Sequence, residues 1–317
     1  METVKAKATW KENITQQLSI RIKNSWQLYV MLLLPVAYII IFNYIPMYGA
    51  QIAFRRYDGS QSILESPWVG MYYFKKFFDS YQFERVLTNT LMISLYSLVA
   101  GFPLPIIFAL ALNVTRSAKY RKVVQMVTYM PHFISTVVLV GIVMQVFNTR
   151  IGLYGKLMEA MGMTAVNLLG SPAAFPHLYV LSGIWQSVGW STIIYLAALS
   201  NVDQEQHEAA IVDGASRFKR VIYVDIPAIM PTAIILLIMN AGQLMSVGFE
   251  KAYIMQNSLN ISASELISTY VYKIGLTNGG GDFSYGAAIG LFNSVVNLVL
   301  LLIVNAISKK VSDTSLW

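Results

Sequence analysis

Long apolar blocks separated by short polar stretches dominate this sequence of 317 residues. A helix that crosses the hydrocarbon layer of a membrane needs roughly 20 mostly apolar residues, because its backbone polar groups find no water there. Six blocks are long enough, at residues 28–48, 90–112, 123–147, 178–199, 232–255 and 285–307. The pattern therefore predicts an all-α, polytopic membrane protein with six transmembrane helices.

The composition indicates the same class of protein. Hydrophobic residues make up 56% of the chain and charged residues 12%, whereas soluble proteins carry about 25% charged residues. No cysteine is present, which excludes disulfides, thiol catalysis and cysteine metal sites. His132, His177 and His207 lie far apart in the predicted topology, so we expect no metal site. No paired carboxylates lie within a predicted helix core, so we expect no hydrolytic activity.

The positions of lysine and arginine predict the orientation. These residues prefer the cytoplasmic side, and an internal N-terminus places 14 of the 23 in the inner segments. We therefore expect cytoplasmic ends at 1–27 and 309–317, a first helix with an outer loop at 28–84, and a transmembrane core at 85–308. The net charge of +7 follows from this bias and from contact with anionic lipids, and requires no nucleic-acid partner.

The polar loop 201–231 falls on the predicted cytoplasmic face. Its informative residues are small, acidic or helix-ending: Glu208, Ala209, Ala210, Asp213, Gly214, Ala215 and Pro227. Helix formers that lead to a glycine, followed by an amphipathic run and prolines, predict a helix, a sharp turn and a second helix. Such a loop can dock another protein, although a solvated helix face would also account for the two carboxylates.

The order Glu-Ala-Ala, three residues, glycine, and Ile-Pro twelve residues later resembles the coupling-loop motif of permease subunits in binding-protein-dependent ABC importers. Further stretches resemble the maltose-permease-like branch that contains lipoprotein-linked and alginate permeases. These are YIPMYG at 44–49, SPWVG at 66–70, YMPHFIS at 129–135, TYVY at 269–272 and GLF at 290–292. The sequence departs from the family pattern at Gln204, Gln206 and His207, where proline, leucine and tyrosine are usual.

The resemblance, which runs from about residue 28 to the C-terminus, implies the fold of a type I ABC importer permease in the bacterial cytoplasmic membrane. It implies as partners a second homologous permease, two ATPase subunits, an extracellular solute-binding lipoprotein and a carbohydrate. The helix that carries Glu208 would then sit in a cleft of the ATPase. ATP and Mg²⁺ would be bound by that partner, since this sequence has no G-x-x-x-x-G-K-[ST] phosphate loop.

Polar and aromatic residues inside the predicted helices are candidates for the substrate pathway, because such groups are costly in lipid. They are Trp185, Gln186, Trp190, Asn240, Gln243, Asn293 and Asn297. Amides and aromatic faces suit neutral carbohydrates, but hydrogen bonds between helices explain the amides equally well. The alternative function is an ion-coupled secondary transporter of a small polar solute, which would need acidic residues that the helix centres largely lack.

Overall fold

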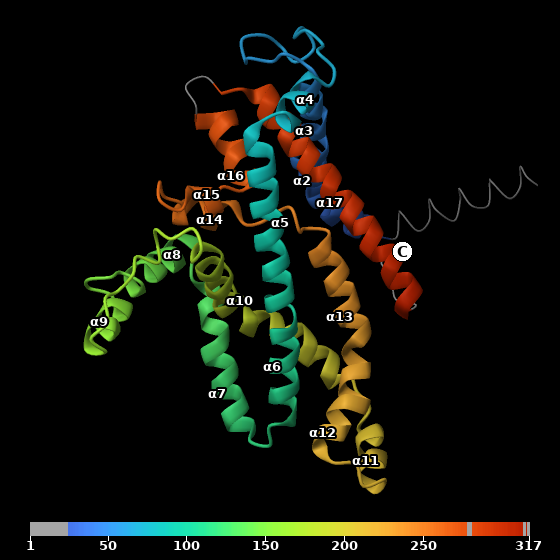
Figure 1. The fold of residues 1–317 in the computed structure, drawn as a ribbon. Coiled ribbons are helices and arrows are strands. Elements are labelled where there is room, and N and C mark those ends of the chain that lie inside the picture. Colours follow the sequence, from blue (N-terminus) through green and yellow to red (C-terminus); the bar gives the residue numbers. More distant parts are fainter. Residues whose placement is uncertain (1–24, 278–280, 313–314, 316–317) are drawn as a thin grey trace, which may run out of the picture.

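A computed structural model describes residues 25–277, 281–312 and 315. The predicted cytoplasmic segment 1–27 lies almost entirely outside these residues, and the predicted tail 309–317 lies partly outside them. Within the described ranges every regular element is a helix, apart from an isolated bridge between Arg55 and Trp68. Figure 1 shows these helices as one elongated bundle.

The first half of the chain contains α2 (Trp26–Ile39), η1 (Ile40–Tyr44), α3 (Ile45–Met47), η2 (Tyr48–Phe54), α4 (Tyr72–Phe78), α5 (Tyr81–Gly101), α6 (Pro103–Val114), α7 (Ala118–Tyr129), η3 (Met130–Phe133), α8 (Thr136–Val146) and α9 (Leu153–Ala160). The second half contains α10 (Phe175–Ser200), α11 (Gln204–Val212), α12 (Arg217–Arg220), η4 (Val221–Asp225), α13 (Ile226–Ala241), α14 (Phe249–Met255), α15 (Ile261–Ser264), α16 (Ile267–Tyr272), η5 (Lys273–Thr277) and α17 (Phe283–Ser312). The η elements are short 3₁₀ or π segments.

Four helical stretches in the described part are long and apolar enough to cross a membrane: Trp26–Phe54, Tyr81–Val114, Arg217–Ala241 and Phe283–Lys310. A bent pair raises the number to five. The helix α10 covers the predicted block 178–199 and has the length to span, but its serines, tryptophans and glutamine keep it outside this set. The predicted count of six transmembrane helices is therefore not confirmed exactly, because α10 is not among these stretches.

The predicted helix 123–147 is wrong as one straight span. The stretches Ala118–Phe133 and Thr136–Val146 are bent by 103° relative to each other. Pro131 lies in the 3₁₀ turn that ends the first stretch, where it supplies no backbone donor. Ser135 then starts α8 as a helix cap, because its Oγ accepts a hydrogen bond from the Val138 amide at 3.4 Å.

The predicted helix 232–255 is wrong in its limits. The continuous helix begins earlier, at Arg217, and ends at Ala241. A turn at 242–248 separates it from α14. Asn297 Oδ1 accepts a hydrogen bond from the Met245 amide at 2.8 Å, and Ser94 Oγ donates to the carbonyl of Leu244. Satisfying these backbone groups permits a helix break inside the bundle.

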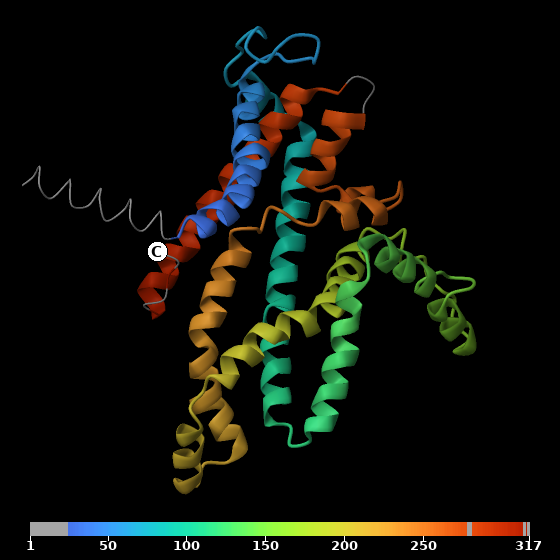
Figure 2. The same ribbon diagram turned by 180° about the vertical axis from the view of Figure 1, so that it is seen from behind.

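The helix α10 crosses the bundle obliquely and passes in front of α5 and α6 in the view of Figure 2. At Gly189 an added Cβ would overlap the carbonyl oxygen of Thr128, so only glycine allows α7 and α10 to approach this closely. Three residues further along α10, the Thr192 hydroxyl donates to the carbonyl of Pro105 at 3.4 Å. Because Pro105 lies in α6, α10 contacts both α6 and α7 along this stretch.

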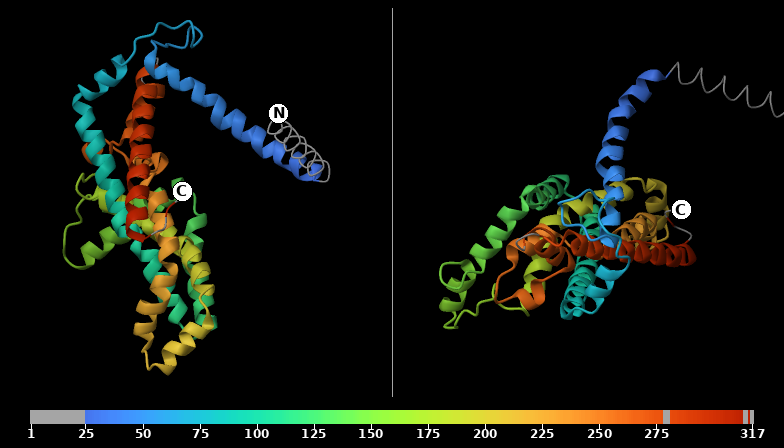
Figure 3. Two further views of the ribbon diagram at one scale, coloured as in Figure 1. Left: turned by 90° about the vertical axis from the view of Figure 1, so that its right-hand side faces the viewer. Right: turned by 90° about the horizontal axis from the view of Figure 1, so that it is seen from above.

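The first long helix stands apart from the others. No residue in the most apolar window of Trp26–Phe54 is buried, and Figure 3 shows α2 leaving the bundle at an angle. At the end where it joins the rest, Phe77 of α4 packs edge-on against the rings of Phe83 and Tyr285. This aromatic cluster connects α4, α5 and α17 beneath the loop 55–71, which lies at the top of Figure 1.

Candidate functional sites: a helical loop and an internal cavity

The loop between α10 and α13 has the predicted form of two helices joined by a tight turn. Gly214 has φ +73°, and its amide bonds to the Ile211 carbonyl at 3.0 Å. The Ala215 amide reaches back to the Ala210 carbonyl at 2.9 Å, which completes a Schellman motif. Ser216 then caps α12 by accepting from the Lys219 amide, so the sharp turn follows from local sequence.

This loop projects from one end of the molecule, opposite the loop 55–71 (Figure 1). No residue of α11 is buried. Glu208, Ala209, Asp213 and Gly214 are exposed, and so is Val212, at 86%. Exposed apolar side chains beside carboxylates, on a helix with both ends capped, form a surface suited to a protein partner.

A polar node fixes the loop to the helices above it. His207 Nε2 lies 3.3 Å from Asp225 Oδ1, and Asn113 Nδ2 donates to the same oxygen at 3.3 Å. Asp225 is buried, with 2% of its surface exposed. Since these residues belong to α11, η4 and α6, the node joins three elements. In the sequence, the signal for this node was the departure from the family pattern at His207. The partner of His207, Asp225, could not be identified from the sequence.

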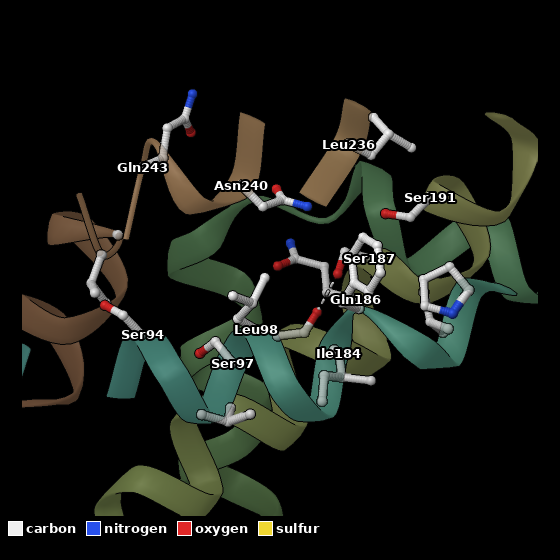
Figure 4. Close-up of a pocket in the computed structure, with 18 of the residues that line it drawn as sticks. Ser94, Ser97, Leu98, Ile184, Gln186, Ser187, Ser191, Leu236, Asn240 and Gln243 are labelled. Carbon is white, nitrogen blue, oxygen red and sulfur yellow. Dashed lines mark hydrogen bonds between the residues drawn. The ribbon is translucent and has the colours of Figure 1, made fainter. Parts of the chain in front are cut away.

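The helix that leaves this loop ends at a cavity between the helices. Leu236 and Asn240, from α13, line a space of about 560 Å³ together with residues of α5, α6, α10 and α14. Hydroxyls dominate the polar part of its wall, which contains Ser94, Ser97, Ser187 and Ser191. Figure 4 shows Gln186 and Asn240 facing this space from α10 and α13. The wall can therefore offer donors and acceptors to a polyhydroxylated solute.

Three of the predicted pathway residues, Gln186, Asn240 and Gln243, line this cavity. Gln186 also donates from Nε2 to the Ile134 carbonyl at 2.8 Å, which holds the bend between η3 and α8. The structure thus brings three amides, from α10, α13 and the turn 242–248, to one space.

The other four predicted pathway residues lie elsewhere. Trp185 and Trp190 are exposed outside the cavity wall, and Trp190 stacks on His132 with 4.5 Å between ring centroids. Asn297 is committed to the turn 242–248, where its Nδ2 also donates to Ser246 Oγ at 2.8 Å. Asn293 is not among the lining residues, and its Oδ1 is buried without a hydrogen-bond partner.

Sequence reasoning did not identify Lys251 as a candidate site residue. The turn at 242–248 redirects the chain, so α14 brings Lys251 into the cavity wall. The lysine is 8% exposed, and its Nζ donates to the Tyr179 carbonyl at 2.6 Å. Its neighbour Glu250 is exposed.

A family model described as the inner membrane component of binding-protein-dependent transport systems matches residues 101–313. The chain belongs to that family. This permease is similar to the protein LplB of Bacillus subtilis strain 168, with 42% identity over 295 residues, which cover 93% of the permease and 92% of LplB. It is 37% identical, over the whole of both chains, to YteP, the polygalacturonan/rhamnogalacturonan transport system permease protein of the same organism.

Solved structures confirm the fold of an ABC importer permease. A chain of a bacterial ABC transporter involved in the import of the acidic polysaccharide alginate superimposes with a TM-score of 0.85 and 37% identity, covering 93% of this permease and 99% of that chain. A second match, at 0.85 and 36%, comes from the alginate transporter in complex with an alginate pentasaccharide-bound periplasmic protein. It covers 93% of this permease and 98% of that chain.

Proposed function

We propose that this permease is one of two membrane subunits of an ATP-driven importer of oligosaccharides. The names of its relatives support a carbohydrate substrate, since LplB and YteP match nearly the whole chain and YteP is named for a polysaccharide. The cavity supports it too, because its serines and amides suit sugar hydroxyls. The permease itself performs no chemistry, and a separate ATPase pair binds ATP and Mg²⁺.

The observation that carries this proposal is the physical connection between the exposed loop and the cavity. The loop continues directly into the helix Arg217–Ala241, whose far end lines the cavity. The His207–Asp225–Asn113 node adds a second connection, to the end of α6. A partner that displaces the loop would therefore move two walls of the cavity at once.

The remaining partners follow from this assignment. A second homologous permease would complete the pathway, and an extracellular solute-binding lipoprotein would deliver the sugar, as the complex of the alginate transporter with a periplasmic protein suggests. The loop 201–231 and both chain termini would face the cytoplasm. No acidic residue lines the cavity among the described residues, which leaves the ion-coupled alternative without a carboxylate for its cation.

Co-purification with an ATPase tests the proposal. A tagged permease, extracted in mild detergent, should bring an ATPase with it and support uptake of an oligosaccharide. Glu208→Lys reverses a charge on exposed α11 and should reduce both the ATPase retained and the uptake several-fold, since charge-assisted contacts at an interface contribute about 1.5–3 kcal/mol. Glu159→Lys, which reverses an exposed charge on α9, is the matched control and should change neither.

Two results would contradict the proposal. One is a wild-type permease that retains no ATPase under conditions where its own fold survives. The other is a Glu208→Lys variant with unchanged uptake.

A further inference from the structure

Lys251 is a buried cation in the wall of the cavity. It lies on α14, the short helix that follows the turn 242–248. Its Nζ is positioned over the ring of Tyr179, 4.6 Å from the centroid. Gly183 on α10 makes room for it, because a Cβ there would lie 3.1 Å from the ammonium nitrogen. The lysine is therefore accommodated by specific neighbours.

Among the described residues, Lys251 has no counter-charge in an ion pair or in the cavity wall. It is the only charged residue among the described residues that line the cavity. None of the ion pairs found in the described part of the chain includes it. Its neighbour Glu250 is exposed rather than turned into the cavity wall. Burying an ammonium without a carboxylate is unfavourable, so the site is electrostatically incomplete.

The hydrogen bonding of Lys251 is incomplete as well. An ammonium carries three N–H donors, and the structure supplies one acceptor, the carbonyl oxygen of Tyr179 at 2.6 Å. Lys251 stands in the wall of the cavity, where a bound solute can supply acceptors for the remaining donors. An anionic group of a solute would supply both the missing charge and the missing acceptors.

The rest of the wall indicates what kind of molecule would carry that anion. Hydroxyls of Ser94, Ser97 and Ser187 and the amides of Gln186 and Asn240 surround the same space. This combination of one cation with many neutral polar groups matches a sugar ring that bears a single carboxylate. It differs from the neutral sugars that the amides and aromatic residues alone had indicated.

We propose that Lys251 binds a sugar carboxylate in the translocation cavity and so makes the importer selective for uronate-containing oligosaccharides. This inference rests on the proposed function, since it names the substrate class of the same cavity. A charge-assisted hydrogen bond in a site of low dielectric is stronger than one in water. Lys251 would therefore favour acidic chains over neutral chains of equal length.

The absence of native cysteine allows a direct test in the whole importer. Ser187→Cys places a thiol in the cavity, and Thr164→Cys places one on an exposed loop outside it. Both are labelled with sulfonatoethyl methanethiosulfonate in open membrane fragments, where reagents reach both faces. The probes are trigalacturonate and its carboxyl-reduced trisaccharide, which has the same length and linkage but no charge.

Trigalacturonate should slow the labelling of Ser187→Cys at concentrations where the reduced trisaccharide does not, and it should leave Thr164→Cys unaffected. Adding Lys251→Gln should raise the trigalacturonate concentration needed for protection about tenfold or more, the size expected for loss of one hydrogen bond to a charged group. Lys251→Arg keeps the charge and should retain most of the protection. Retention of the ATPase by each variant shows that the importer is assembled.

Equal protection by both sugars, protection that survives Lys251→Gln, or no protection by either sugar would each overturn the assignment of Lys251. None of these results would affect the proposed function if the permease still retained its ATPase and supported uptake of a neutral oligosaccharide. Loss of the ATPase from the wild-type permease would instead contradict the proposed function.

Discussion

Replacing Gly214 by alanine should loosen the turn between α11 and α12. The glycine has φ +73°, a conformation that costs an L-residue with a Cβ about 1–2 kcal/mol. No atom lies within 4 Å of the Cβ that alanine would add, so the cost comes from the backbone alone. A cost of this size corresponds to an increase of about 5–30-fold in the population of the open turn.

Hydrogen exchange measures this population. The amides of Gly214 and Ala215, which bond to the carbonyls of Ile211 and Ala210, should exchange about 5–30-fold faster in Gly214→Ala. Oligosaccharide uptake by Gly214→Ala should also fall, because a loosened loop transmits less of the movement of its partner. Gly214→Asn should show a smaller change, since asparagine tolerates this region better than alanine.

The control is Gly141→Ala on α8. This position also has nothing within 4 Å of the added Cβ, but it has ordinary helical geometry. Alanine there should be neutral or stabilising by up to about 1 kcal/mol. If Gly214→Ala exchanged at the wild-type rate, the backbone argument would be refuted.

Two further variants test the polar node and the helix packing. His207→Ala removes one of the two polar contacts of buried Asp225 and should lower the stability of the importer by about 1.5–3 kcal/mol. The variant should also import less sugar per ATP hydrolysed. His207→Gln should recover part of that coupling ratio, and an unchanged ratio in His207→Ala would exclude the node from transmission. Gly189→Ala should destabilise the solubilised importer by about 1–3 kcal/mol, because the added Cβ would overlap the Thr128 carbonyl. The expected measurement is a lower Tm, and an unchanged Tm would contradict the packing argument.

The sequence predicted those features that depend on neighbouring residues. The apolar blocks at 28–48, 90–112 and 285–307 lie within long helices, since block length alone decides whether a helix can span. The turn at Gly214 was predicted for a similar reason, because its Schellman bonds join residues only three and five positions apart.

The features that sequence did not predict depend on distant partners. The sequence predicted one helix at 123–147, but the bend of 103° is held by Gln186, which is 52 positions away from Ile134. The turn at 242–248 is capped by Asn297 and Ser94, and no local pattern could show this. The position of Lys251 in the cavity wall follows from that same turn.

The same distinction between local pattern and distant contacts applies to the candidate substrate residues. Residue type identified amides that are costly in lipid, yet type alone could not tell an amide in the cavity wall from one used in packing. Asn240 lines the cavity, whereas Asn297 bonds the backbone of the turn. Only the contacts distinguish the two.

The turn at 242–248 also divides the permease mechanically. The helix that begins at the loop stops at the cavity, and beyond the turn Ala252 and Met255 of α14 pack into a separate core with Ile93 and Val140. Because the helix Arg217–Ala241 ends inside the bundle, its end can move without displacing α14 and the core beyond the turn. The part of the bundle beyond the turn can thus stay in place while a displacement of the loop changes the shape of the cavity.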